Sequence, residues 1–149
     1  MCADLWSFAL STYARPGVEA ACLRLQEQGA DVCLLLCAAW LEHRRIACDE
    51  ARFECLRACA EPWQRDVVQP LRQLRTQWRE AATHDDELSA LRGLIKGLEL
   101  EAERTLLRRL EAATLGWFAC IRGRSVAGGV GGAASAAAHS MLLHSIRAH

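Results

Sequence analysis

Residues 32–41 read VCLLLCAAWL, a run in which the only polar side chains are two cysteines. A helix that is apolar on every side is stable only when neighbouring elements cover it on several sides. A buried strand is the other structure open to a short apolar run. The Ala38-Ala39 pair and the direct exit into the charged residues 42–45 favour a helix. We therefore predict a central buried helix that the rest of the chain encloses.

Helix start and stop signals surround this run in both directions. Asp4, Asp31 and Asp49 are placed as N-caps, and Pro16-Gly17 and Gly29 end the segments before the central helix. Pro62 is expected to end the fourth helix and begin the fifth, which Pro70 should kink or interrupt. A capping box, Thr83-x-x-Asp86, is expected to open the last helix. The helices so predicted cover about residues 5–14, 18–28, 32–45, 50–61, 63–82 and 87–115.

The fold class that follows is all-α. We expect a single compact domain of five or six helices around the buried central helix, with the two long C-terminal segments packed antiparallel. The helical domain is assigned to residues 1–121. Residues 122–149 are rich in glycine and alanine, and we expect a flexible tail there.

Charge and hydropathy exclude several classes of function. The 149 residues carry 18 basic and 18 acidic side chains, so no excess of positive charge favours a nucleic-acid partner. The first residues, MCADLW, lack the basic region of a secretory signal. No apolar run reaches the length of about 20 residues that a membrane span needs. We expect a cytoplasmic protein without a membrane span, whose eight cysteines stay reduced.

Two cysteine pairs and two glutamate pairs could hold a metal. Cys33/Cys37 and Cys55/Cys59, like Glu50/Glu54 and Glu99/Glu103, are four residues apart and share a helix face. The cysteine spacing is not that of ordinary structural zinc sites, and no glutamate has the histidine three residues on that ferritin-like di-metal sites use. We assign the cysteines to packing and expect no metal and no cofactor. No phosphate loop, metalloprotease motif or nucleophile elbow occurs, so we assign no catalytic residue.

An arginine-rich face on the predicted helix 63–82 is the candidate site. Arg65, Arg72, Arg75 and Arg79 fall on one side of it, with Trp63 and Trp78 nearby. Such a surface could bind an acidic protein or another anion, because guanidinium groups bind carboxylates and phosphates with two parallel hydrogen bonds. The same arginines could instead pair with Asp66, Glu80 and acidic residues of the last helix. Both interpretations remain open at this point.

Three stretches resemble a known family. They are LWSFALSTYARPGVEAACLRLQEQGADVCLLLCAAWL (residues 5–41), WQRDVVQPLRQLR (63–75) and LRGLIKGLELEAER (91–104). Together they are similar to the small proteobacterial family called domain of unknown function 2390, and the resemblance extends to about Leu115. It implies a compact bacterial cytoplasmic helical protein and no known catalytic activity.

Amphipathic helices without a catalytic constellation indicate a binding protein. We expect a non-enzymatic protein-binding or adaptor module. One alternative is a small-ligand or lipid-binding protein, which needs a large apolar pocket beside the central helix. The other is a metal-dependent protein that uses the helical Cys or Glu pairs. A homo-oligomer is a further expectation, because 52% apolar residues and five tryptophans are much for a small monomer to bury.

Overall fold

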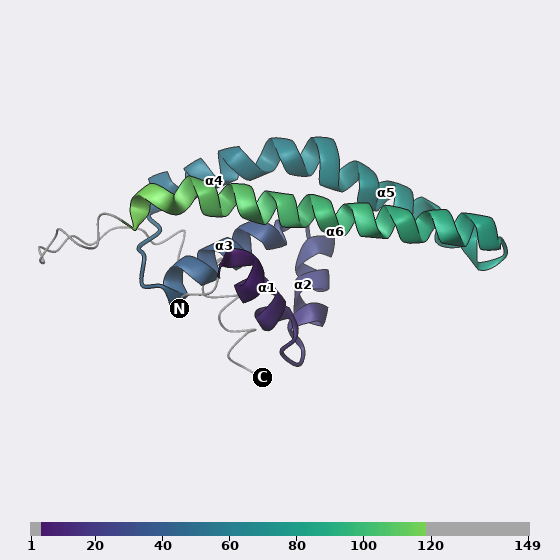
Figure 1. Cartoon of the computed structure of the whole chain (residues 1–149), viewed down its shortest axis with the longest axis horizontal. Coiled ribbons are helices and arrows are strands. Elements are labelled where there is room, and N and C mark those ends of the chain that lie inside the picture. The colour runs from purple at the N-terminus through teal and green to yellow at the C-terminus, as the bar shows by residue number, and fades with distance from the viewer. Residues whose placement is uncertain (1–3, 119–149) are drawn as a thin grey trace, which may run out of the picture.

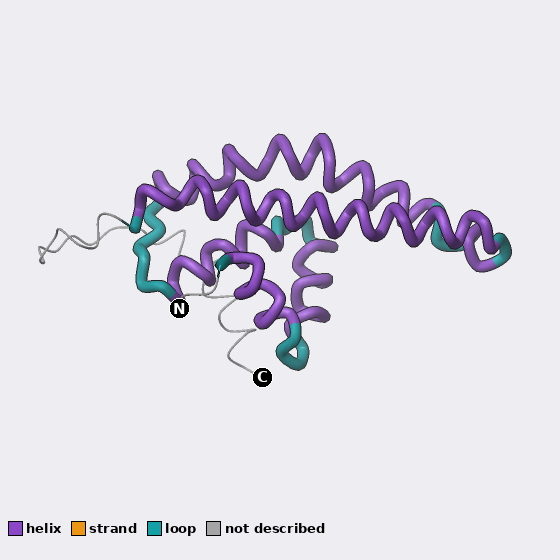
Figure 2. The backbone as a smooth tube through the Cα atoms, in the orientation of Figure 1, coloured by secondary structure: helices purple, strands orange, loops and turns teal. Residues whose placement is uncertain are grey.

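The computed structural model describes residues 4–118. Every regular element in this range is helical, which confirms the predicted all-α class (Figure 2). The α-helices are α1 (Leu5–Tyr13), α2 (Val18–Glu27), α3 (Val32–His43), α4 (Glu50–Trp63), α5 (Gln69–Gln77) and α6 (Asp86–Thr114). Between them lie a π-helical turn, η1 (Gln64–Val68), and two short 3-10 turns, η2 (Ala81–Thr83) and η3 (Leu115–Trp117).

Two long rods and a three-helix body make up the molecule (Figure 1). α4, η1 and α5 follow one another without a break and form the first rod, and α6 returns antiparallel beside it. The helices α1, α2 and α3 pack beneath one half of this pair. The other half extends beyond the body, and there α5 packs chiefly against α6. We call this half, residues 69–101, the arm.

α3 is the centre of the body, as predicted. Of its residues from Val32 to Leu41, all except Leu35 are buried. Helices α1, α2, α4 and α6 all contact α3, so it has a neighbour on each side that its apolar surface requires. The apolar core of the body continues from α3 into Leu56 of α4 and Leu106 and Leu110 of α6.

Aspartate caps fix the starts of four helices. The side chains of Asp4, Asp31 and Asp49 accept hydrogen bonds from backbone N–H groups three residues on, as predicted. For α6 the capping-box prediction is wrong: Asp85 is the cap and accepts from the N–H of Leu88. The hydroxyl of Thr83 instead donates to the carbonyl of Glu80, because Thr83 belongs to the preceding 3-10 turn.

The first rod departs from the predicted break at Pro62. α4 continues through Pro62 and ends one residue later. The carbonyl that would bond to an N–H at position 62 belongs to Ala58, an exposed residue that water can reach, so the missing bond is tolerated. The interruption that was predicted at Pro70 is present, just before that residue. There the N–H of Gln69 reaches back five residues to the carbonyl of Gln64, which defines the π-helical turn.

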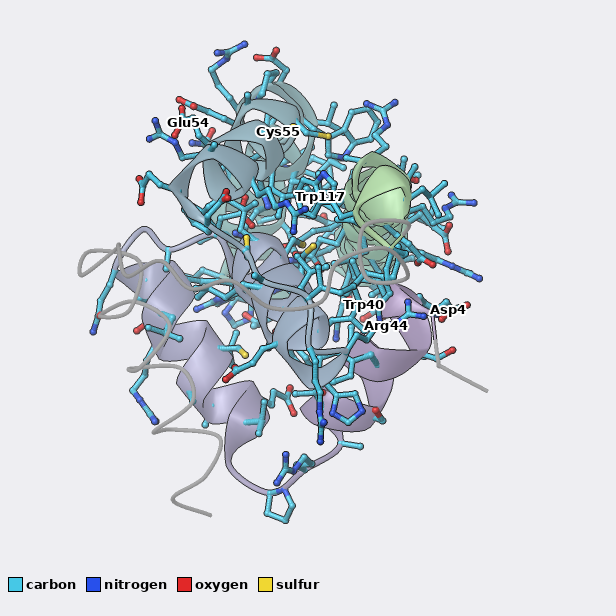
Figure 3. All side chains as sticks on the ribbon, turned by 90° about the vertical axis from the view of Figure 1, so that its left-hand side faces the viewer. Asp4, Trp40, Arg44, Glu54, Cys55 and Trp117 are labelled. Atoms are coloured by element: carbon cyan, nitrogen blue, oxygen red, sulfur yellow. The ribbon has the colours of Figure 1, made fainter. Side chains whose placement is uncertain are left out.

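Arginine–aromatic stacking closes the end of the molecule opposite the arm. The guanidinium group of Arg44 lies 4.7 Å from the ring centroid of Trp40 and 4.4 Å from that of Phe118. Arg52 lies over Trp117 at 5.0 Å. Figure 3 looks onto this end, with Trp40 and Arg44 beside each other and Trp117 above them. These contacts join α3 and α4 to η3 and to Phe118, which follows η3.

No helix among residues 4–118 is long and apolar enough to cross a membrane. The predicted division into a domain of residues 1–121 and a tail of residues 122–149 falls outside the described residues, and so does the expected flexibility of the tail.

Candidate functional site

The predicted arginine face is spread along the first rod, and its members have different surroundings. Arg65 is exposed and forms two hydrogen bonds with its neighbour Asp66, at 2.8 and 2.9 Å. Arg79 is exposed and makes no ion pair with any described residue. Arg72 and Arg75 face α6. The four guanidinium groups therefore do not converge on one point.

Arg72 and Arg75 join the two rods through a network of ion pairs. Arg72 donates to Glu99 at 2.9 Å and to Glu103, one turn further along α6, at 2.7 Å. Arg75 binds both carboxylate oxygens of Glu99. Arg92 of α6 in turn donates to the backbone carbonyl of Arg75 at 2.9 Å. The Glu99/Glu103 pair is therefore the partner of both arginines, at the root of the arm, where the arm joins the body.

The two glutamates of this network respond differently to their surroundings. Burial favours the neutral form of Glu99, but the guanidinium groups of Arg75 and Arg72 outweigh burial and lower the pKa of Glu99. Burial dominates at Glu103 and raises its pKa, although Arg72 opposes that change. Glu99 is therefore an anion whose two oxygens are both bonded to arginines. Glu103 accepts one hydrogen bond, which offsets the cost of burying its charge only in part.

The two tryptophans of the predicted surface take different positions. The indole Nε1 of Trp63 donates to the carbonyl of Ala102 at 2.9 Å, and Arg109 stacks 3.9 Å from its ring centroid. Trp63 thus fastens α4 to α6. Trp78 caps the C-terminal end of α5 in the arm and is half-buried.

A cleft of about 410 Å³ opens between the α2–α3 turn and the π-helical turn. Its position beside the start of α3 is the one expected for a ligand pocket. Nine of its 14 lining residues have polar or charged side chains, although most of the surface exposed to the cleft is apolar. Lining residues that bear on the chemistry are Asp31, Arg57, Glu61, Gln64, Arg72 and Glu103. The π-helical turn supplies Gln64, and irregular turns of this kind are frequent at functional sites.

Two polar side chains of this cleft, Asp31 and Gln64, hold acceptor oxygens whose burial is only partly compensated. Asp31 accepts from the N–H of Leu34 at 3.2 Å and from the amide of Gln64 at 2.9 Å. Burial raises the pKa of Asp31, since these two neutral donors and the more distant Arg72 only partly offset it. The other amide atom of Gln64, Oε1, is buried and has no partner among the described residues. The cleft therefore offers a ligand two buried acceptors, at Asp31 and at Oε1 of Gln64.

The cysteines that the structure describes do not come together as a set of metal ligands. Cys33 and Cys37 are buried in α3, and burial raises the pKa of the Cys37 thiol to about 12. Cys55 is exposed on the outer side of α4, where Figure 3 shows it beside Glu54. Within residues 4–118 no group of three or more His, Cys, Asp or Glu side chains is placed to hold a metal ion. The structure gives the metal-dependent alternative no site in that range.

Three leucines of the arm form a surface that the sequence did not reveal. Leu91, Leu94 and Leu98 of α6 are 50%, 66% and 55% exposed. Their spacing of three and four residues places them on one face of the helix, and we call them the leucine stripe. In the sequence, Leu91 and Leu98 belong to an apolar repeat with spacings of three and four residues that continues to Leu106 and Leu110. The sequence does not show that this part of the helix lies beyond the body.

A family model described as "Protein of unknown function (DUF2390)" matches residues 4–110. The matched span includes the body, the network of arginines and glutamates, and the whole arm. No curated protein and no solved structure matches the chain.

Proposed function

For this chain, which belongs to the DUF2390 family, we propose a non-enzymatic role as a protein-binding or adaptor module of the bacterial cytoplasm. The partner contributes a helix, which docks on the leucine stripe of the arm. A fold of this kind does not by itself imply an activity, so the proposal rests on the surface alone.

The observation that carries the proposal is the exposure of the stripe. Single exposed leucines are common, but three on one face of a rigid helix make a continuous apolar strip. α5 packs on a different face of α6, where Leu88 and Ile95 are half-buried and Glu99 is buried. The stripe is therefore left open on the flank of the helix pair, in the geometry by which an amphipathic helix recognises another.

The arm is also rigid enough to present this surface. The ion pairs of Arg72 and Arg75 with Glu99 and Glu103 hold α5 against α6 at its root. A docking surface on a fixed helix loses less conformational entropy on binding than one on a loop. In this proposal, Arg72 and Arg75 of the predicted arginine face hold the arm in position. Any direct contact of that face with the partner is made by Arg79 and Trp78.

Affinity purification of the full-length chain from cells that express it naturally tests the proposal. We compare the unchanged chain with the double variant Leu91→Ser, Leu94→Ser. The matched control is Leu23→Ser, because Leu23 is 51% exposed on α2 and lies outside the stripe. We expect one identified protein to be retained by the unchanged chain and by the control, and to fall at least tenfold with the stripe variant.

Equal recovery of that protein with the stripe variant would overturn the proposal. So would light scattering that finds a second copy of the chain as its sole partner, or a turnover screen that finds conversion of a substrate. Circular dichroism melts of the three proteins check that each is folded.

The cleft supports a second candidate function, the binding of a small polar cation. Asp31, Glu103 and the unpartnered Oε1 of Gln64 provide acceptors. Three arginines also line the cleft, and each is already bonded to a carboxylate: Arg57 to Glu54, Arg65 to Asp66 and Arg72 to Glu103. A ligand that binds only the folded state stabilises it by RT ln(1 + [L]/Kd), so the melting temperature rises with the ligand concentration.

Agmatine should raise the melting temperature, and butylguanidine and butylamine should do so less. Lauric acid producing the larger shift would contradict this candidate.

A further inference from the structure

The charges around the leucine stripe define the chemistry of what docks there, provided that the proposed function of the stripe holds. Glu87 lies four residues before Leu91, and Glu101 lies three residues after Leu98. Both spacings continue the same helix face, so an exposed carboxylate stands at each end of the apolar strip. Glu87 makes no ion pair with a described residue, and Glu101 has one long contact, 3.8 Å to Arg104.

The exposed charges of the arm as a whole, these two glutamates included, are mostly negative. Its exposed acidic residues are Glu80, Asp85, Asp86, Glu87 and Glu101, against Arg79 and Lys96 as exposed bases. Lys96 lies five residues after Leu91, which places it away from the stripe's face. The arm is therefore an acidic surface with an apolar strip along it, on a chain that is neutral overall.

A second copy of the chain fits this pattern poorly. If two stripes lie antiparallel with Leu91 opposite Leu98, Glu87 of one copy comes beside Glu101 of the other at both ends. If they lie parallel, each glutamate meets its own equivalent. Either arrangement places like charges at the two ends of a small apolar contact, which opposes association. An anionic membrane surface is disfavoured by the same carboxylates.

We propose that the leucine stripe binds a basic amphipathic helix of another protein, with an apolar strip between two lysine or arginine side chains. Glu87 and Glu101 are 14 residues apart, which is about 21 Å along a helix axis. The partner's two basic residues therefore stand about 14 positions apart, one for each carboxylate. Its apolar strip spans the seven or eight residues in the middle.

Two designed peptides test this chemistry. Both are 18-residue helices with leucines at positions that match the stripe; one carries lysine, the other glutamate, at positions 2 and 16. Fluorescence anisotropy with the full chain measures Kd at 50 and 200 mM salt. We expect the lysine peptide to bind at least tenfold more tightly at 50 mM, and the advantage to shrink at 200 mM because salt screens the exposed charges.

Variants of the chain assign the effect to the named residues. Glu87→Gln with Glu101→Gln should remove most of the lysine peptide's advantage. Leu91→Ser with Leu94→Ser should weaken both peptides at least tenfold, and Leu23→Ser should change neither. Vesicles of phosphatidylglycerol provide the lipid comparison, and the unchanged chain should not sediment with them.

The outcomes separate this inference from the proposed function. If both peptides bind equally and the stripe variant weakens both, docking on the stripe stands and the basic partner is wrong. If neither peptide binds, or if the stripe variant changes nothing, the stripe is not a helix-docking surface and both proposals fail. Sedimentation of the unchanged chain with the vesicles would also overturn the basic-helix inference.

Discussion

Arg45 holds a backbone conformation that side chains rarely adopt. Its φ is +57°, and it is the sole non-glycine residue with positive φ among residues 4–118. It follows the end of α3, where the N–H of Ile46 bonds to the carbonyl of Leu41 and the N–H of Arg45 to that of Glu42. This is the pattern of a helix end that glycine usually completes. Gly29 fills the equivalent place after α2, with φ of +85°.

Arg45→Gly should therefore stabilise the protein by about 0.5–1 kcal/mol, because glycine pays no steric cost in the left-handed region. Urea denaturation followed by tryptophan fluorescence measures the change as a shift in midpoint at constant slope. Gly29→Ala is the matched control and should destabilise by about 1 kcal/mol. Its added Cβ meets nothing within 4 Å, so backbone strain is the whole effect. Destabilisation by Arg45→Gly would contradict the strain assigned to position 45.

Asp31 makes the stability of the body depend on pH. Burial raises its pKa, so the folded state binds a proton more readily than the unfolded chain does. This part of the stability is present at acid pH and is lost as pH rises from about 4, the ordinary range of aspartate, through the folded pKa. Asp31→Asn keeps an oxygen for the N-cap and removes the buried charge. It should raise the melting temperature at pH 7, and the gain should vanish near pH 3.5.

Glu99→Gln provides the opposite case for this measurement. Arg75 and Arg72 hold the pKa of Glu99 below its ordinary value, so Glu99 stabilises the fold at neutral pH and loses that effect as pH falls. Thermal melts from pH 3.5 to 7 should show the two variants diverging from the unchanged protein in opposite directions. A melting temperature of Asp31→Asn that falls below that of the unchanged protein at pH 7 would contradict the account of the cleft.

Individual residues differed in how far the sequence could predict them. Asp4, Asp31 and Asp49 were found as caps because a cap acts on N–H groups three residues away, within one local stretch. The bonds of Arg72 to Glu99 and Glu103 join residues 27 and 31 positions apart. Acidic residues of the last helix were foreseen as possible partners. Which ones depends on the register of two rods, and no local pattern sets that register.

The first rod shows how an element can contain proline without ending. Pro62 lies inside α4, one residue before the helix ends, and Pro70 is the second residue of α5, which follows the π-helical turn. Sequence signals treat proline as a helix breaker, which led to a predicted boundary at position 62. Packing of Leu56, Ala60 and Trp63 on the body and α6 holds the helix on both sides of it. The π-helical turn has no sequence signal beyond Pro70, because the neighbouring residues are compatible with an ordinary helix.

Pro62→Ala should stabilise the protein by up to about 3 kcal/mol, because it restores an N–H for the carbonyl of Ala58 inside an exposed part of α4. Denaturant midpoints give the stability, and amide hydrogen exchange of residues 60–64 should slow. Pro16→Ala, in the turn between α1 and α2, is the control and should not stabilise, because it frees the unfolded chain without adding a helical bond. A loss of stability with Pro62→Ala would show that α4 needs the proline for its direction.

At the scale of the whole molecule, α6 changes role along its length. Leu106 and Leu110 are fully buried against the body, whereas Leu91, Leu94 and Leu98 lie on the arm and are half-exposed or more. The apolar repeat continues along the entire helix, and its period alone cannot say where the body stops. The sequence predicted the all-α class and the central helix because these follow from the apolar run at 32–41. It did not predict the arm, because the arm exists only where the two long rods extend past the shorter helices of the body, and a sequence does not show that arrangement.

This division of α6 predicts a sharp contrast in stability. Leu106→Ala should cost about 2–5 kcal/mol, since it opens a cavity in the core. Leu94→Ala should change the free energy of unfolding by no more than about 0.5 kcal/mol, because its side chain is 66% exposed. Guanidinium denaturation of the two variants measures both values. A large loss at Leu94 would mean that the stripe is covered within the chain and is not available to a partner.

Site-specific photo-crosslinking in living cells tests most directly the central claim that the arm docks a partner helix. A photoreactive phenylalanine analogue replaces Leu94 in one full-length protein and Leu23 in a second. From position 94 we predict a crosslink to one different protein, within a helix whose apolar strip lies between lysine or arginine residues, and no such crosslink from position 23. The same set of crosslinks from both positions, or none from position 94, would contradict it.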